Sequence, residues 1–232
     1  MKACFADLPD KLVDIQFLKG VCKKYHYGDE GYDSLRSVAE TMLPLVGKGL
    51  CIKHRISAHF EEVPENGREE GSCFAEAVIT LGEGPDKLQE AYAEKGYLSE
   101  CYMVEALASE LLLHAYTVYN TYVAENTSYH VARYHFLGSE AEYPMEMLPG
   151  LLERLEAPVT CNEALCMIPK KSVAFVAELT DDESVRCGGI CIGCRSRSCP
   201  NRMDEGLNIG RLIADMTDLP MSYGYSRIFG KG

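Results

Sequence analysis

The pattern of apolar and polar positions along the chain predicts a mixture of helices and strands. The strongest signal covers 99–124, where apolar residues recur at helical spacing and form one stripe. Two boundary signals accompany weaker helical patterns: Asp10 is expected to cap a helix over 10–24, and Pro44 to end a helix over 37–43. Further elements are expected as helices over 86–95 and 148–155, and as strands over 49–60, 74–81 and 172–179.

These elements favour the α+β class. Strands and helices follow one another without a regular βαβ alternation, which predicts a mixed or antiparallel sheet with long helices. We expect residues 1–180 to form the α+β body. Residues 181–232 are turn-rich and are expected to form a separate C-terminal segment, with a short helix over 207–216. An acidic stretch over 61–71 is expected to be a surface loop.

Composition narrows the function classes. A chain of 232 residues with 47% hydrophobic and 25% charged residues can bury a full core and is expected to form one large domain, or one with a small appendage. The net charge of −12 argues against nucleic acid as a partner. No apolar run approaches the roughly 20 residues that span a bilayer, and the N-terminus meets acids too early for a signal peptide. We therefore expect a cytoplasmic protein without a membrane partner.

Four cysteines within thirteen residues form the most informative motif of the chain. Cys187, Cys191, Cys194 and Cys199 follow the spacing C-x3-C-x2-C-x4-C, with glycines between them and Pro200 after the last thiol. Four thiolates in one short glycine-rich loop are typical of an iron–sulfur site, and we expect a [4Fe–4S] cluster here. Four thiolates also satisfy zinc tetrahedrally, so zinc remains the alternative metal.

Arginines surround these cysteines, and no acid lies among them. One interpretation is that they offset the negative charge of a tetrathiolate cluster and tune its potential. The other is a solvated charge run that balances the acids at 181–183 just upstream. The residues assigned to the cluster environment are Arg186, Arg195, Arg197 and Arg202.

Three segments, in order, resemble a known family. The stretch Ala106-Leu-Ala-Ser-Glu-Leu-Leu-Leu-His114 is similar to the long helix of the reactivation domain of cobalamin-dependent methionine synthase, which binds S-adenosylmethionine. The stretch Arg133-Tyr-His-Phe-Leu-Gly138 stands where that family has Arg-x-x-Pro-Gly-Tyr, although Ser139 replaces the tyrosine. The stretch Asn162-Glu-Ala-Leu-Cys-Met-Ile-Pro-Lys-Lys-Ser-Val173 resembles the family's Thr-Glu-Ser-x-x-Met-x-Pro-x-x-Ser-Val. Together the resemblance covers about residues 50–180.

The resemblance implies a fold and a set of ligand contacts. It implies the activation-domain fold for the body, and S-adenosylmethionine as a ligand whose binding residues would be Arg133, Gly138, Met167 and Pro169. The catalytic modules of methionine synthase have no counterpart in this chain, so it would act as a stand-alone activation protein. The cysteine loop resembles the Cys-rich tail of small free-standing relatives.

The resemblance and the cysteine loop together suggest a redox role. We expect a reductive activator of a corrinoid methyltransferase or methionine synthase, which passes an electron through the cluster to return Co(II) to Co(I). The partner would supply the cobalamin, and a flavodoxin or ferredoxin type of donor would supply the electron. Two alternatives remain: a non-redox zinc module that docks on a corrinoid protein or binds S-adenosylmethionine, and a methyltransferase-like enzyme, for which no acid–base constellation is found.

Overall fold

A four-stranded antiparallel sheet organises the chain. The computed structural model describes residues 5–57, 73–185, 187 and 190. The strand order is β1 (Cys51–Ser57), β2 (Cys73–Thr80), β6 (Ser172–Thr180) and β3 (His130–Phe136), so β1 and β3 form the two edges. The antiparallel sheet with helices confirms the expected α+β class. The expected loop over 61–71 and helix over 207–216 lie outside the described residues.

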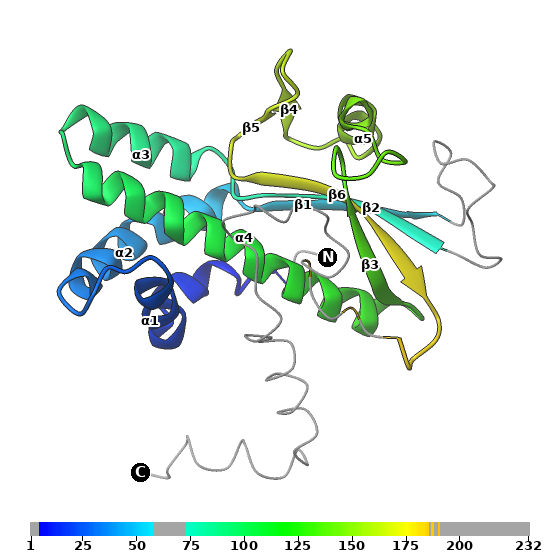
Figure 1. Cartoon of the computed structure of the whole chain (residues 1–232), viewed down its shortest axis with the longest axis horizontal. Helices are drawn as coiled ribbons and strands as arrows, with labels where there is room; N and C mark the ends of the chain where they lie inside the picture. The colour runs from blue at the N-terminus through cyan, green and yellow to red at the C-terminus, as the bar shows by residue number, and fades with distance from the viewer. Residues whose placement is uncertain (1–4, 58–72, 186, 188–189, 191–232) are drawn as a thin grey trace, which may run out of the picture.

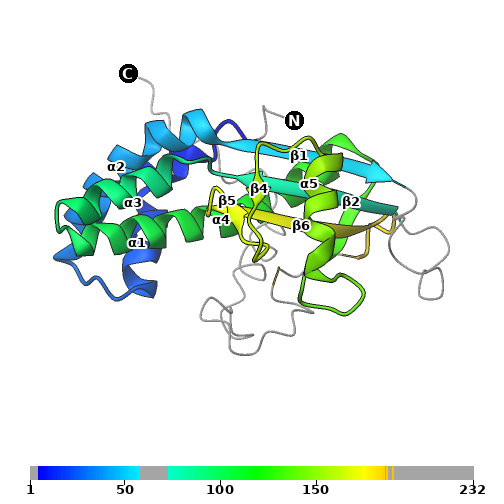
Figure 2. The same ribbon diagram turned by 90° about the horizontal axis from the view of Figure 1, so that it is seen from above.

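Helical elements cover the two faces of this sheet unequally (Figures 1 and 2). The helix face carries the long α4 (Leu98–Asn126), together with the short 3-10 helix η1 (Pro9–Val13), α1 (Ile15–Lys24) and α2 (Gly31–Gly49). Helix α3 (Gly84–Glu94) packs against α2 and α4. The opposite face carries η3 (Met145–Met147), α5 (Leu148–Arg154) and the hairpin of β4 (Thr160–Cys161) and β5 (Met167–Ile168).

Each face of the sheet has its own hydrophobic core. Along β6, Phe175, Ala177 and Leu179 belong to the larger core under α1, α2 and α4, whereas Ala174 and Val176 belong to the smaller core under α5. Alternate side chains of a strand point to opposite faces, which explains this division. Within the described residues, no helix is long and apolar enough to cross a membrane.

Helix α2 corrects the expectation that Pro44 ends a helix over 37–43. The helix runs from Gly31 to Gly49, with Pro44 inside it. Proline removes one backbone N–H from the helical ladder, but it does not remove the apolar positions on either side. Met42 and Val46 flank the proline, and both are fully buried in the larger core. Packing of this apolar face therefore outweighs the local cost of the proline.

The first long helix begins later than its sequence pattern suggests. Asp10 was expected as the cap, but it lies within η1, and Asp14 caps α1 instead. The Asp14 carboxylate accepts hydrogen bonds from the backbone N–H groups of Gln16 at 2.8 Å and Phe17 at 2.9 Å. The bond from Phe17 is the main reason why the pKa of Asp14 is lowered.

Most of the other expected elements are confirmed with small shifts of their ends. The helices over 86–95, 99–124 and 148–155 correspond to α3, α4 and α5, and the three strand patterns correspond to β1, β2 and β6. Gly96, with φ +76°, follows α3 as expected for a helix end. The sequence pattern did not identify β3 as a strand, nor the short β4–β5 hairpin.

Candidate functional site

The structure describes one of the four cysteines of the motif. Cys187 lies within the described residues, whereas Cys191, Cys194 and Cys199 lie outside them. The four assigned arginines, Arg186, Arg195, Arg197 and Arg202, also lie outside. The geometry of a complete cluster site therefore stays a prediction, and Cys187 is the point at which the motif can be placed on the fold.

Cys187 is half-buried against the core of the helix face. It packs there together with Ile190, next to the buried Tyr134 of β3. The Tyr134 hydroxyl lies 2.6 Å from Asn120 Oδ1 and 3.3 Å from the carbonyl oxygen of Tyr116, both on α4. Burial, and to a smaller degree the neighbouring Cys187, holds the pKa of Tyr134 well above its usual range. The motif thus begins where β3 meets α4.

The opposite face of β3 carries a group of charged side chains, here called the β3 charge cluster: Arg133, His135, Glu140 and Glu178. Arg133 Nη2 donates to Glu140 Oε2 at 3.0 Å, while the other carboxylate oxygen of Glu140 lies 3.2 Å from His135 Nδ1. Arg133 stands directly opposite Glu178 in the pairing of β3 with β6. A single carboxylate therefore bridges the two basic side chains.

His135 is the buried centre of this cluster. Its side chain is 7% exposed, and its second ring nitrogen, Nε2, lies 3.5 Å from Glu178 Oε2. The imidazole stacks on the ring of Tyr143, with centroids 4.3 Å apart. The hydrogen bond to His135 lowers the pKa of Glu178, despite the opposing effect of burial. Carboxylates of Glu140 and Glu178 therefore flank the imidazole on both sides.

The β3 charge cluster leaves donor capacity on Arg133. The guanidinium carries five N–H donors, and the structure pairs one of its nitrogens with Glu140. Its Nε atom is buried and has no hydrogen-bond partner among the described residues. The side chain as a whole is 40% exposed. Arg133 is therefore anchored by Glu140 and still able to donate to an anionic group.

Gly138 closes the turn that follows β3 and brings Glu140 back to the strand. It adopts φ +80°, a backbone conformation that side chains disfavour, and its N–H donates to the carbonyl oxygen of Tyr143 at 2.7 Å. An added Cβ would lie 3.2 Å from the Met145 terminal methyl group. The structure thus brings together Arg133 and Gly138, two of the four residues expected to contact a ligand.

Met167 and Pro169 come from other elements of the same face. Met167 belongs to the β4–β5 hairpin, and Pro169 precedes the first residue of β6, where its carbonyl oxygen accepts a hydrogen bond from Ser172 at 2.7 Å. Glu178, opposite Arg133, is six residues further along this strand, which corresponds to about 20 Å at 3.3 Å per residue. The structure does not place Pro169 beside Arg133.

The three segments of the resemblance nevertheless join in one body. Lys171 Nζ, from the third segment, donates to Glu105 Oε1 and lies 3.3 Å from Ser109 Oγ of the first segment, on α4. The second segment joins α4 through Tyr134 and Asn120. Segments far apart in the sequence are therefore held by polar contacts across the sheet and along α4.

No group of three or more His, Cys, Asp or Glu side chains in the described part of the chain is arranged to hold a metal ion. In the β3 charge cluster, both ring nitrogens of His135 face carboxylates of the protein, so neither nitrogen points to an open ligand position. The donor set that fits a cluster or zinc is the set of four cysteines, of which the structure describes Cys187.

Sequence reasoning singled out Arg133 and Gly138, but it did not point to their neighbours Glu140, Tyr143 and Glu178. Glu140 and Tyr143 lie within ten residues of Arg133, in a turn whose acids carry no motif. Glu178 is 45 positions away, and only the β3–β6 register brings it opposite Arg133. A strand assignment for 130–136 was the one signal that could have pointed to these contacts.

Comparisons with known proteins complete the description. No family model matches the chain, and no curated protein matches it. Among solved structures, the chain is similar to the crystal structure of the MetH reactivation domain bound to AdoHcy. The sequence identity is 16% and the TM-score 0.46, over 68% of this chain and 67% of that chain.

Proposed function

We propose that this chain is a reductive activator of a corrinoid-dependent methyltransferase or methionine synthase. It accepts one electron from a low-potential donor of the flavodoxin or ferredoxin type and passes it to the partner's Co(II) corrinoid, which becomes Co(I). The donor is oxidised by one electron in the same step. The partner contributes the cobalamin, and this chain contributes the docking surface and the cysteine ligands.

One observation supports this proposal: Cys187, the first cysteine of the motif, and Arg133 both lie at the edge strand β3. β3 is an edge strand, and its consecutive residues Arg133 and Tyr134 lie on opposite faces of the sheet. Cys187 packs beside Tyr134, and the β3 charge cluster surrounds Arg133. A partner that docks on this edge would meet both the start of the cysteine motif and a partly exposed arginine.

The proposed roles follow from the donor chemistry. Cys187, Cys191, Cys194 and Cys199 would hold the iron–sulfur cluster. An all-cysteine [4Fe–4S] cluster supplies the low-potential electron that Co(II) requires. Arg186, Arg195, Arg197 and Arg202 would lower the energetic cost of the negative charge near the four thiolates and add electrostatic attraction for a partner.

A methyl donor of the S-adenosylmethionine type would bind at Arg133 and Gly138. Arg133 has donor capacity left for an anionic group such as a ligand carboxylate, and Glu140 holds its guanidinium in place. Gly138 shapes the turn next to it. Met167, in the β4–β5 hairpin, and Pro169, just before β6, stay predicted ligand contacts of the same donor site.

Metal analysis tests the cluster directly. Anaerobically purified protein should be brown and should contain about four irons and four sulfides per chain. Cys191→Ser should lose them, whereas Cys166→Ser, which changes an exposed cysteine outside the motif, should retain them. A colourless protein with one zinc and no sulfide would replace the redox proposal with the zinc module.

A spectrophotometric Co(II)-to-Co(I) assay with a corrinoid protein and a strong reductant tests the activity. The wild type and Cys166→Ser should accelerate the reduction, and Cys191→Ser should not, although it should still bind the corrinoid protein. Arg133→Ala should weaken donor binding while the cluster absorption stays unchanged. Equal rates with wild type, Cys191→Ser and no protein would overturn the proposal.

The division of the chain into a body over 1–180 and a cluster segment over 181–232 has its own test. Both described cores are built almost entirely from residues before 180, with Cys187 and Ile190 packed at the margin. A variant with all four motif cysteines replaced by serine should therefore keep a cooperative unfolding transition. Loss of that transition would show that the cluster organises the whole fold.

A further inference from the structure

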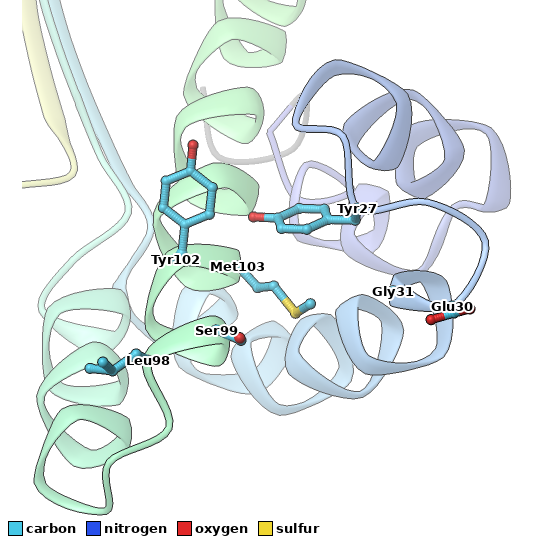
Figure 3. Close-up of a pocket in the computed structure, with 7 residues that line it drawn as sticks. All are labelled: Tyr27, Glu30, Gly31, Leu98, Ser99, Tyr102 and Met103. Atoms are coloured by element: carbon cyan, nitrogen blue, oxygen red, sulfur yellow. The ribbon is translucent and has the colours of Figure 1, made fainter.

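We infer that a small cavity at the N-terminal end of α4 binds an N-methylated ammonium cation, such as a choline-like small molecule. The cavity lies between the α1–α2 connection and the first turns of α4, and its volume is about 560 Å³. This inference goes beyond the proposed function and uses none of its residues. The residues that line the cavity are Tyr27, Glu30, Gly31, Leu98, Ser99, Tyr102 and Met103 (Figure 3).

Tyrosine rings form a corner at this cavity. The rings of Tyr27 and Tyr102 have centroids 6.1 Å apart and stand at 74° to each other, and the Tyr25 ring lies behind them, 6.3 Å from Tyr27 and 6.2 Å from Tyr102. In Figure 3 the Tyr27 ring reaches from the α1–α2 connection towards α4. Electron-rich ring faces set at an angle to one another are the arrangement that attracts methylated ammonium groups.

The structure already contains a cation on this group of rings. Lys24 Nζ lies 5.7 Å from the centroid of the Tyr25 ring, and it also contacts Glu110 Oε1 at 2.5 Å. The Tyr25 hydroxyl donates to the same carboxylate oxygen at 3.0 Å. The outer face of the tyrosine group is therefore occupied by a protein cation, while the side that faces the cavity has no lysine or arginine among its lining residues.

The charges around the cavity favour a cation over an anion. Of the seven lining residues, Glu30 is the one that carries a charge. The N-termini of α2 and α4 both lie at the cavity and would by themselves attract anions. However, Asp33 and Glu100 stand in the first turns of these helices and offset that partial positive charge. The acidic side chains at the cavity therefore favour a cationic ligand.

The remaining lining groups suit a methylated ligand with a polar end. Met103 contributes a thioether that contacts methyl groups readily, and Ser99 contributes a hydroxyl. The hydroxyl of Tyr27 is buried and has no hydrogen-bond partner among the described residues. Burial and the neighbouring Tyr102 raise the pKa of Tyr27 to about 12, so its ring stays neutral at physiological pH. The Ser99 hydroxyl is therefore the lining group assigned to the polar end of the ligand.

Choline chloride and its uncharged isostere 3,3-dimethylbutan-1-ol provide a matched pair of probes. They have the same shape, so only the charge distinguishes cation–π attraction from plain hydrophobic contact. In NMR titrations of the full-length protein, choline should bind about five- to tenfold more tightly than the isostere. Saturation of tyrosine ring protons should transfer to the choline methyl groups.

Variants at exposed positions locate the site without disturbing the core. Tyr102 is 54% exposed, so Tyr102→Leu should leave the fold intact and weaken choline binding about tenfold. Tyr97, which is 52% exposed and does not line the cavity, provides the control, and Tyr97→Leu should bind choline as the wild type does. Glu30→Gln should weaken binding by a smaller factor, and added salt should reduce that difference.

Three outcomes would overturn the inference. The first is equal affinity for choline and the isostere, and the second is choline binding that Tyr102→Leu leaves unchanged. The third is a much tighter complex with a trimethyllysine peptide than with choline, which would assign the cavity to a protein partner. The metal content and the cobalt assay decide the proposed function separately, so failure here leaves that proposal untouched.

Discussion

The two faces of the central sheet differ in what they bury. On the helix face, β6 presents Phe175, Ala177 and Leu179 to a large core that is apolar apart from tyrosine hydroxyls. On the α5 face, the same strand presents Ala174 and Val176 to a smaller core and then Glu178 to the β3 charge cluster. A second ion pair, Glu76 with Arg154, also lies on this face. Strand β6 therefore contributes apolar side chains to the core on the helix face and a carboxylate to the β3 charge cluster on the α5 face.

The two faces therefore separate apolar packing, which stabilises the fold, from paired charges, which are costly to bury in the same core. Buried charges cost stability unless they are paired, and a tightly packed apolar core tolerates few of them. The helix face contains the aromatic group in which Tyr116, Tyr134 and Phe175 contact one another, with centroids 5.1 to 5.4 Å apart. The α5 face contains the paired charges, and among them the Arg133 side chain is 40% exposed.

The largest expected effect is the loss of a large core side chain on the helix face. Phe175 is fully buried, so Phe175→Ala should lower the free energy of unfolding by about 3–5 kcal/mol. Leu151→Ala, in the smaller core, should lower it by about 2–3 kcal/mol, because a leucine buries less apolar surface than a phenylalanine. Urea denaturation measures both. Equal losses would mean that the two cores contribute alike.

Breaking the Glu76–Arg154 pair should be nearly as costly. Glu76 is 4% exposed as a side chain, and Arg154 donates to its Oε1 atom from Nε at 3.0 Å and from Nη2 at 2.6 Å. Arg154→Met should lower the free energy of unfolding by about 3 kcal/mol, because a buried carboxylate loses its partner. Glu76→Leu in the same chain should restore most of the loss. If the double variant is no more stable than Arg154→Met, packing and not charge explains the effect.

A smaller effect is expected at the cap of α1, within the helix layer. Asp14→Ala removes two hydrogen bonds to backbone N–H groups and should cost about 1 kcal/mol. Asp10→Ala is the matched control, since Asp10 makes no side-chain cap in the structure, and it should change stability by less than about 0.5 kcal/mol. Thermal unfolding compares the two. A larger effect at Asp10 would mean that Asp10, as the sequence pattern suggests, and not Asp14, caps the helix.

The smallest effect is a change in acid sensitivity on the α5 face. The hydrogen bond from His135 lowers the pKa of Glu178 below its unfolded value, so the ionised carboxylate stabilises the folded state above that value. This contribution should disappear as the pH falls from about 4.3 through the lower folded pKa. Glu178→Gln should therefore show a flatter stability profile between about pH 5 and pH 3. An unchanged slope would mean that other carboxylates control acid unfolding.

The sequence by itself determined most elements and the class of the fold. Periodicity over 99–124 and alternation over 74–81 are local properties, and they correctly predicted α4 and β2. The motif containing Cys187 and the family-like segment around Arg133 were also visible as short stretches. These features depend on neighbours within one or two turns of chain, so no distant contact is needed to recognise them.

Only the tertiary structure decided how helix α2 continues and which charges meet. Pro44 opposes a helix locally, yet burial of Met42 and Val46 carries α2 through it. The partners Glu76 and Arg154 are 78 residues apart, and Glu178 reaches His135 only through the register of β3 and β6. Burial and ion pairing across strands depend on distances in space, which local patterns do not contain. For that reason the cysteine motif was readable from the sequence, and the β3 charge cluster was not.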